Sequence, residues 1–263
     1  QFEGEEGDPI LAANYGDRPD LSLPQVQVDY IKSLAAVGAK IVLVLCGGSP
    51  IELGELVDLV EAIVFVWYPG QAGGTAVADV LFGNQSPSGK LPITFPMSVD
   101  QLPPFEEYDM SKRTYRYSQE TPLYPFGFGL SYSQFAYTEL VLDQDEVEKG
   151  ESVQGKFTLT NNGTIEAEEV AQLYLTDVEA SVLVPQHKLV SFERVRLQSG
   201  ESKTIPFTIA PEMMMFADGA GQFQLEPGAF HLTIGGCSPG ERGQELGAST
   251  GLMAAFTVIQ SQN

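Results

Sequence analysis

Acidic residues near the start of the chain have the types and spacing that could do chemistry. Glu3, Glu5 and Glu6 lie within four residues, and Asp8 follows closely. Hydrolysis of a glycosidic bond needs two carboxyl groups that flank the bond, one of which donates a proton to the leaving oxygen. Neighbouring acids or partial burial favour that protonated form, because they raise the pKa of a carboxyl group. This loop is therefore a candidate proton donor, although composition alone also fits an exposed acidic loop.

The composition is typical of a globular chain that does not bind nucleic acid. Hydrophobic residues make up 43% of the 263 residues and charged residues 19%, which argues against disorder. The 35 acidic residues outnumber the 14 basic ones and give a formal net charge of -21, which repels nucleic acid and anionic membranes but not a neutral sugar. A solubility charge is the simpler interpretation of this excess. No apolar run approaches the roughly 20 residues of a membrane helix.

The two cysteines, Cys46 and Cys237, are too few to define a disulfide scaffold or a zinc site. The two histidines, His187 and His231, have no matching Cys/His ligand set. The cysteines and histidines therefore do not indicate a zinc site.

Residues 1–105 show the alternation of helices and strands that characterises an α/β domain with a largely parallel sheet. The expected elements are a helix over 24–37, a buried strand over 41–46, a short acidic helix over 53–60, a second buried strand over 62–67 and a small-residue helix over 73–82. Two strands are too few for a stable sheet of this kind. Because Gln1 also opens directly into a loop, we expect an upstream portion that supplies the other strands.

The remainder of the chain is predicted to be a connector followed by an all-β domain. Residues 106–134 are rich in Tyr, Pro and Gly, which favours a connector that packs on a surface over a flexible tether. From residue 135 to 263, short β-type runs alternate with turn signals, as in an antiparallel β-sandwich. The runs are 155–160, 169–175, 188–197, 203–209 and 228–234.

Short strings along almost the whole chain, in order, resemble glycoside hydrolase family three, in its β-glucosidase and β-xylosidase members. The strings are FEGEE at 2–6, GDRPDLSLP at 16–24, IVLVL at 41–45, GSPI at 48–51, WYPGQAGG at 67–74, ADVLFG at 78–83, SPSGKLP at 86–92, YRY at 115–117, PLYPFGFGLSY at 122–132, NNG at 161–163, VAQLY at 170–174 and LQSGE at 197–201. Each string alone is weak evidence, but the ordered set is highly specific.

The resemblance implies a three-domain enzyme with an N-terminal (β/α)8 barrel, an α/β sandwich and a fibronectin-III-like, immunoglobulin-like β-sandwich. An Asp on the barrel would attack the anomeric carbon while a Glu on the α/β sandwich loop protonates the leaving group, with retention of configuration. Alignment with the E-x-E pattern of the family makes Glu5 the first candidate, with Glu3 and Glu6 as alternates. Asp17 and Arg18 are interpreted as an ion pair that supports the loop, with direct sugar contact as the alternative.

Other features have structural interpretations that compete with functional ones. Gly-rich turns follow both predicted strands, where open α/β sheets bind ligands, but neither turn has the G-x-G-x-x-G or phosphate-loop pattern, so a nucleotide role is nearly discarded. Trp67 could stack on a sugar, but it ends an apolar strand, so core packing is the favoured interpretation.

The resulting hypothesis is a retaining exo-β-glycosidase that hydrolyses terminal non-reducing β-D-glucosyl residues, or β-xylosyl residues, of oligosaccharides or aryl glycosides. The barrel would belong to the same protein or to a partner chain, and the 263 residues alone are expected to be inactive. The alternative is a non-catalytic β-sandwich module that binds or positions carbohydrate. The resemblance also implies a secreted or periplasmic protein that needs no metal and no organic cofactor.

Overall fold

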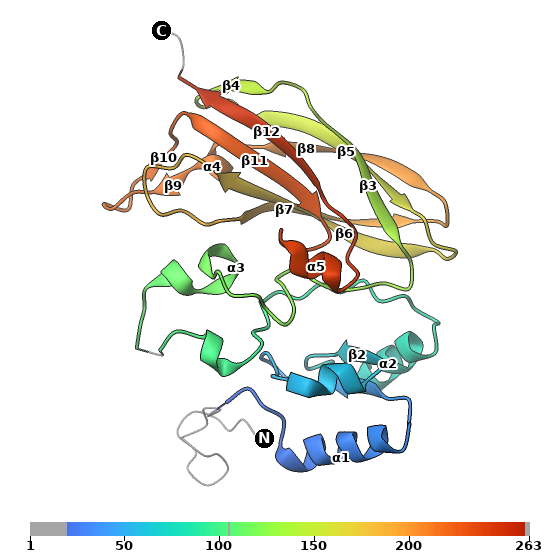
Figure 1. The fold of residues 1–263 in the computed structure, drawn as a ribbon. Helices are drawn as coiled ribbons and strands as arrows, with labels where there is room; N and C mark the ends of the chain where they lie inside the picture. The colour runs from blue at the N-terminus through green and yellow to red at the C-terminus, as the bar shows by residue number, and fades with distance from the viewer. Residues whose placement is uncertain (1–19, 105, 261–263) are drawn as a thin grey trace. The chain divides into compact units, whose positions relative to one another are not determined.

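A computed structural model describes residues 20–104 and 106–260 of the chain (Figure 1). The chain separates into two compact units. We call residues 1–84, 95–105 and 120–123 the α/β unit, and residues 85–94, 106–119 and 124–263 the β-sandwich unit. Most of the predicted connector therefore groups with the β-sandwich unit, and so does the segment 85–94, which lies between two parts of the α/β unit in the sequence.

The α/β unit follows the predicted order of elements. Its elements are α1 (Gln25–Ala36), β1 (Val42–Leu45), the 3-10 helix η2 (Gly54–Leu59), β2 (Ala62–Phe65), α2 (Gly73–Leu81) and the 3-10 helix η3 (Val99–Gln101). The two strands pair in parallel, with Val42 opposite Ala62 and Leu45 opposite Phe65. The predicted acidic helix is a 3-10 helix with Glu55 in its first turn.

The strands of the α/β unit are less buried than the sequence predicts. Val42 and Val44 of β1 are 49% and 37% exposed, and β2 has no buried residue. On α1 only Ile31 is buried, whereas Val26 and Tyr30 of the same helical pattern are exposed. A sheet of two parallel strands needs a cover on both faces before such apolar side chains can leave water.

The β-sandwich unit contains a five-stranded sheet in the order β4-β12-β11-β6-β7 and a three-stranded sheet in the order β3-β5-β8 (Figure 1). Its strands are β3 (Phe135–Leu142), β4 (Glu146–Glu148), β5 (Val153–Asn161), β6 (Ala167–Asp177), β7 (Lys188–Leu197), β8 (Ser202–Ile209), β9 (Phe216–Ala217), β10 (Phe223–Gln224), β11 (Gly228–Gly235) and β12 (Leu252–Ile259), and its helices are η4 (Met110–Lys112), α3 (Thr114–Tyr117), α4 (Pro211–Met214) and α5 (Glu241–Glu245). Apart from the parallel pair β4–β12, the strands of both sheets pair antiparallel, which confirms the predicted sandwich.

Strands such as β5 contribute every second residue to the core of the β-sandwich unit. Along β5, Val153, Phe157 and Leu159 are fully buried, whereas the alternate positions 154, 156 and 158 are not. This follows from the two-residue period of a β-strand, which sends alternate side chains to opposite faces. Leu232 and Ile234 of β11 are equally inaccessible and belong to the same hydrophobic cluster. The unit therefore closes a complete core between its own two sheets.

Candidate functional site

The carboxylates predicted to do chemistry lie outside the described residues. These are Glu3, Glu5 and Glu6, and the proposed loop supports Asp17 and Arg18 lie there too. Their roles stay predictions. The described chain begins at Asp20, three residues after Asp17, and shows how the far end of that loop is held.

The end of the loop is anchored to the segment that follows β1. A carboxylate oxygen of Asp20 accepts a hydrogen bond from the Ser22 backbone N–H at 2.9 Å and closes a tight turn. The Leu21 carbonyl accepts the Glu52 N–H at 2.8 Å, and Ser22 forms a parallel bridge with Glu52. Helix α1 begins three residues later, at Gln25. Residues 20–22 are therefore fixed to the segment that follows β1.

Hydrogen bonds from a second segment brace this anchor. The Glu52 carboxylate accepts the Val99 N–H at 3.3 Å, next to η3. Within the same segment the Gln101 side chain accepts the Met97 N–H at 2.6 Å and donates to the Thr121 carbonyl at 3.0 Å. Residues 97–101 thus connect Glu52, to which the end of the loop is bonded, with Thr121 of the same unit.

The carboxyl ends of β1 and β2 meet at one edge of their sheet, the usual place for a ligand in an open α/β sheet. The turn after β1 contains an exposed Cys46 and the pair Gly47–Gly48. The turn after β2 contains Trp67 and Tyr68, of which Tyr68 is 70% exposed. The predicted Gly-rich turns are therefore both at this edge.

Trp67 packs against neighbouring aromatic rings, in keeping with the predicted structural role, and its side chain is partly buried. Its ring lies edge-on against Phe65, with centroids 4.6 Å apart, and against Phe95, with centroids 6.4 Å apart. Edge-to-face pairs at these separations are favourable. A ring packed in this way is not the platform on which a sugar would stack.

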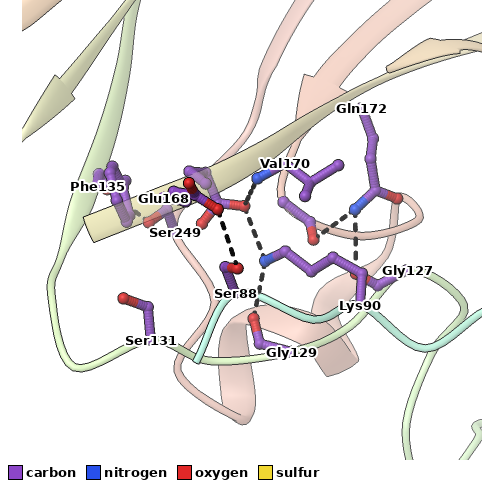
Figure 2. Close-up of polar contacts among 12 residues, drawn as sticks. Ser88, Lys90, Gly127, Gly129, Ser131, Phe135, Glu168, Val170, Gln172 and Ser249 are labelled. Carbon is purple, nitrogen blue, oxygen red and sulfur yellow. Dashed lines mark hydrogen bonds and ion pairs between the residues drawn. The ribbon is translucent and has the colours of Figure 1, made fainter. Parts of the chain in front are cut away.

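A cluster of polar side chains, which the sequence analysis missed, lies inside the β-sandwich unit (Figure 2). We call Lys90, Glu169, Gln172 and Tyr174 the buried polar cluster. Lys90 Nζ lies 2.8 Å from Glu169 Oε1 and donates to the Gly129 carbonyl at 2.8 Å. The side chains of Lys90 and Glu169 are only 12% and 9% exposed.

The rest of the buried polar cluster is equally well bonded. The Gln172 amide donates to the carbonyls of Gly127 and Gly236 at 3.0 and 2.8 Å, and its oxygen accepts the Tyr174 hydroxyl at 2.5 Å. The cluster thus attaches the segments around Lys90 and Gly127 to strand β6.

Burial shifts the pKa values of the groups in and around this cluster. Desolvation raises the pKa of Glu169, and the Lys90 ammonium opposes that rise. Desolvation also raises the pKa of the Cys237 thiol to about 11. The Tyr137 hydroxyl is buried without a hydrogen-bond partner among the described residues, and burial raises its pKa as well. The cation, the carboxylate and the amide of the buried polar cluster bond to one another or to backbone carbonyls in the interior, which favours a structural role for the cluster.

One sequence signal could have revealed the ion pair. Lys90 is the lysine of the SPSGKLP string, and Glu169 follows Glu168 at the start of a strand-like run. A strand sends successive side chains to opposite faces, so one of two adjacent glutamates on a covered strand must face inward and needs a cation. The partner, however, is 79 positions away, and no local pattern identifies it.

The described ranges show no grouping of three or more His, Cys, Asp or Glu side chains that could hold a metal ion. None of the helices in these ranges has the length and apolar character needed to cross a bilayer. His187 makes a contact of 3.0 Å with the Thr176 hydroxyl, and burial lowers its pKa, in keeping with a structural role.

Comparisons with known protein families identify both units. Residues 2–132 match the model of the glycosyl hydrolase family 3 C-terminal domain. Residues 169–238 match the model of the fibronectin type III-like domain. Together these matches include most of the chain and confirm an α/β domain followed by a β-sandwich.

Relatives and solved structures agree with these matches. The chain is 39% identical over 237 residues to a periplasmic beta-glucosidase of Salmonella typhimurium, covering 86% of this chain and 31% of the relative. It is 38% identical over 237 residues to a xylan 1,4-beta-xylosidase of Xylanibacter ruminicola, covering 89% of this chain and 27% of the relative. The crystal structure of a Bifidobacterium adolescentis GH3 beta-glucosidase matches 94% of this chain and 37% of its own with a TM-score of 0.82 and 31% identity.

The chain spans less than a third of the length of these two relatives. The two domain matches, in this order, correspond to the order of the α/β unit and the β-sandwich unit along the chain. The chain belongs to glycosyl hydrolase family 3, of which it carries the C-terminal domain and the fibronectin type III-like domain.

Proposed function

We propose that this chain supplies the acid/base carboxylate of a retaining exo-β-glycosidase that removes terminal non-reducing β-D-glucosyl residues. The observation that carries the proposal is the match of residues 2–132 to the glycosyl hydrolase family 3 C-terminal domain, because this range contains the glutamate cluster. The names of the relatives, beta-glucosidases and beta-xylosidases, support the class of substrate. Hydrolysis of β-xylosyl residues is the alternative specificity.

In this proposal Glu5 is the acid/base, with Glu3 and Glu6 as alternates and the Asp17–Arg18 pair as a support of the loop. Glu5 protonates the leaving oxygen in the first step and removes a proton from water in the second. The attacking Asp belongs to a (β/α)8 barrel in the same protein or in a partner chain. An acid/base group on a loop must be held at a constant, short distance from the reacting bond. The anchor at Ser22 and Glu52 limits the movement of one end of this loop.

Three further expectations belong to the same proposal. The chain would divide into the α/β domain at residues 1–105, the connector at 106–134 and the fibronectin-III-like domain at 135–263. The 263-residue chain without the barrel would be inactive. The protein would be secreted or periplasmic, a placement supported by the periplasmic relative.

The test is Glu5→Gln in the protein with its barrel. Proton donation is needed for a poor leaving group but not for an activated aryl group, so cellobiose hydrolysis should fall by roughly 10²–10⁴-fold while nitrophenyl glucoside cleavage falls much less. Azide should partly restore cleavage of the activated substrate, because it replaces the water that Glu5 would activate. The matched controls are Glu3→Gln and Glu6→Gln.

Equal losses on both substrate classes, or an unchanged rate, would remove Glu5 from the acid/base role. The same pattern in a control variant would move the role to that residue. If none of the three variants shows it, the non-catalytic β-sandwich module becomes the better hypothesis. Parallel rates on nitrophenyl β-glucoside and β-xyloside decide between the two specificities.

A further inference from the structure

We infer that the β-sandwich unit binds one internal water molecule between the side chains of Tyr137, Lys90 and Glu169. The site uses only contacts within this unit. It is independent of the proposed function, because none of the three residues takes part in the proposed chemistry.

The Tyr137 hydroxyl is the group that requires a partner. Tyr137, on β3, is only 5% exposed, and its hydroxyl oxygen has no hydrogen-bond partner in the described part of the chain. A buried hydroxyl without a partner costs free energy, and almost all buried polar groups in native proteins bond to protein or to ordered water. The hydroxyl therefore calls for a partner other than the described protein atoms.

Two further polar groups converge on the same place. A Cβ atom added at Gly236, the residue after β11, would lie 3.4 Å from Lys90 Nζ, 3.4 Å from Glu169 Oε1 and 3.6 Å from the Tyr137 hydroxyl oxygen. The absence of a side chain at Gly236 thus leaves a space that a cation, a carboxylate and a phenol border together. Internal waters occupy polar spaces of this kind, where they make about three hydrogen bonds.

Lys90 and Glu169 can bond to this water and keep their present partners. An ammonium group has three N–H donors, of which Lys90 directs one to Glu169 and one to the Gly129 carbonyl (Figure 2). A carboxylate has about four acceptor positions, and Glu169 uses two of them for Lys90 and the Val170 N–H. The water can therefore accept from Tyr137 and Lys90 and donate to Glu169.

The charges around the space select a neutral ligand. A cation there would lie as close to the Lys90 ammonium as to the Glu169 carboxylate, and so would an anion, so that either ion meets a like charge at short distance. The three groups together offer both donors and acceptors. The smallest neutral molecule that satisfies both kinds of group is water.

The test is a double-mutant cycle in the 263-residue chain. Tyr137→Phe removes the hydroxyl, and Gly236→Ala puts a methyl group where the water would lie, at contacts that neighbouring atoms tolerate. In the wild type, Tyr137→Phe should raise the unfolding equilibrium constant about fivefold, because a hydrogen bond to the water is lost. In the Gly236→Ala background the hydroxyl has no water to bond, so Tyr137→Phe should leave this constant unchanged or lower it. Urea unfolding followed by circular dichroism measures all four chains.

Gly236→Ser is the matched variant, because its hydroxyl can replace the water and should recover part of the stability that Gly236→Ala loses. Gly219→Ala controls for the general effect of replacing a glycine, since an added Cβ there meets nothing within 4 Å beyond its chain neighbours, and it should change stability little. A high-resolution crystal structure of the wild-type chain tests the site without any variant and should show a water bonded to the Tyr137 hydroxyl. A crystal structure without that water would overturn the inference. So would an equal effect of Tyr137→Phe in both backgrounds, or a gain of stability from Tyr137→Phe in the wild type.

Discussion

The α/β unit and the β-sandwich unit differ in how completely they bury their apolar side chains. Val26 on α1 and Val42 on β1 are 75% and 49% exposed, although both belong to apolar patterns. Phe157 and Leu232 of the β-sandwich unit are completely inaccessible. Two packed sheets cover each other, whereas two parallel strands cannot cover both of their own faces. The comparison teaches that an apolar pattern predicts an element reliably, but its burial depends on a partner layer.

The two units also differ in their ion pairs. Lys32 and Glu55 lie 2.5 Å apart in the α/β unit with side chains 39% and 69% exposed. Lys90 and Glu169 lie 2.8 Å apart in the β-sandwich unit and are almost fully enclosed. An exposed pair contributes little because water solvates each charge equally well, but an enclosed charge that loses its partner has no substitute.

The largest difference between the units should appear when a phenylalanine is truncated. Phe157→Ala removes a fully buried ring from the sandwich core and should lower the free energy of unfolding by about 3–5 kcal/mol. Phe82→Ala, at the end of α2, changes a residue that is 83% exposed and should cost no more than about 0.5 kcal/mol. Urea unfolding followed by far-ultraviolet circular dichroism measures both. Similar losses would contradict the contrast between a closed core and an open layer.

The second comparison concerns the two lysines. Lys90→Met leaves the Glu169 carboxylate enclosed without its cation and the Gly129 carbonyl without its donor, and should cost about 3 kcal/mol or more. Lys32→Met should change stability by less than about 1 kcal/mol. The same unfolding experiment applies to both variants. Adding Glu169→Leu to Lys90→Met should recover part of the loss, because no unpaired charge then remains; a further loss would show that the carboxylate is not the source of the cost.

The smallest expected effect is a pH dependence of stability that has opposite sign for two adjacent residues of β6. The pKa of Glu169 is raised, chiefly by desolvation, and the pKa of Glu168 is lowered, chiefly by hydrogen bonds from Arg196 and then Arg194. Above the ordinary carboxyl pKa of about 4.3, the unfolded chain releases the Glu169 proton first, so this group's contribution to stability is present below that pH and is lost as pH rises through its folded pKa. The contribution of Glu168 is present above the ordinary value and is lost as pH falls through its folded pKa.

Glutamine variants of the two residues measure the opposite pH dependences of their contributions to stability. The unfolding free energy of the wild type minus that of Glu169→Gln should decrease as the pH is raised above about 4.3. The corresponding difference for Glu168→Gln should decrease as the pH is lowered below that value. Differences that move in the same direction for both variants would show that the two side chains share one environment, contrary to their placement on opposite faces of β6.

Much of the fold could be predicted from local patterns. The strand β7 has the predicted bounds, Lys188–Leu197, and α1 differs from its prediction by one residue at each end. Strand β3 was not predicted, and its pattern is interrupted where the register shifts between Thr138 and Val141. Glu139 has a φ of 56° at this bulge, so side chains on either side of it do not keep a simple alternation.

The candidate site was predictable in part. The two Gly-rich turns follow β1 and β2 as the residue types predict, and Trp67 packs against other aromatic rings as its structural interpretation requires. The role of the glutamate cluster stays a prediction. The buried polar cluster was missed, because its members come from segments far apart in the sequence and no local pattern pairs them.

The sequence by itself determined the succession of elements and the family, since helix and strand periods and short motifs are local properties. Only the tertiary structure decided which side chains meet. Lys90 and Glu169 are 79 positions apart, and Gly48 and Tyr68 belong to different turns, yet each pair is in contact. The physical reason is that burial and electrostatics depend on distances through space, which arise when distant segments pack and which no local period encodes.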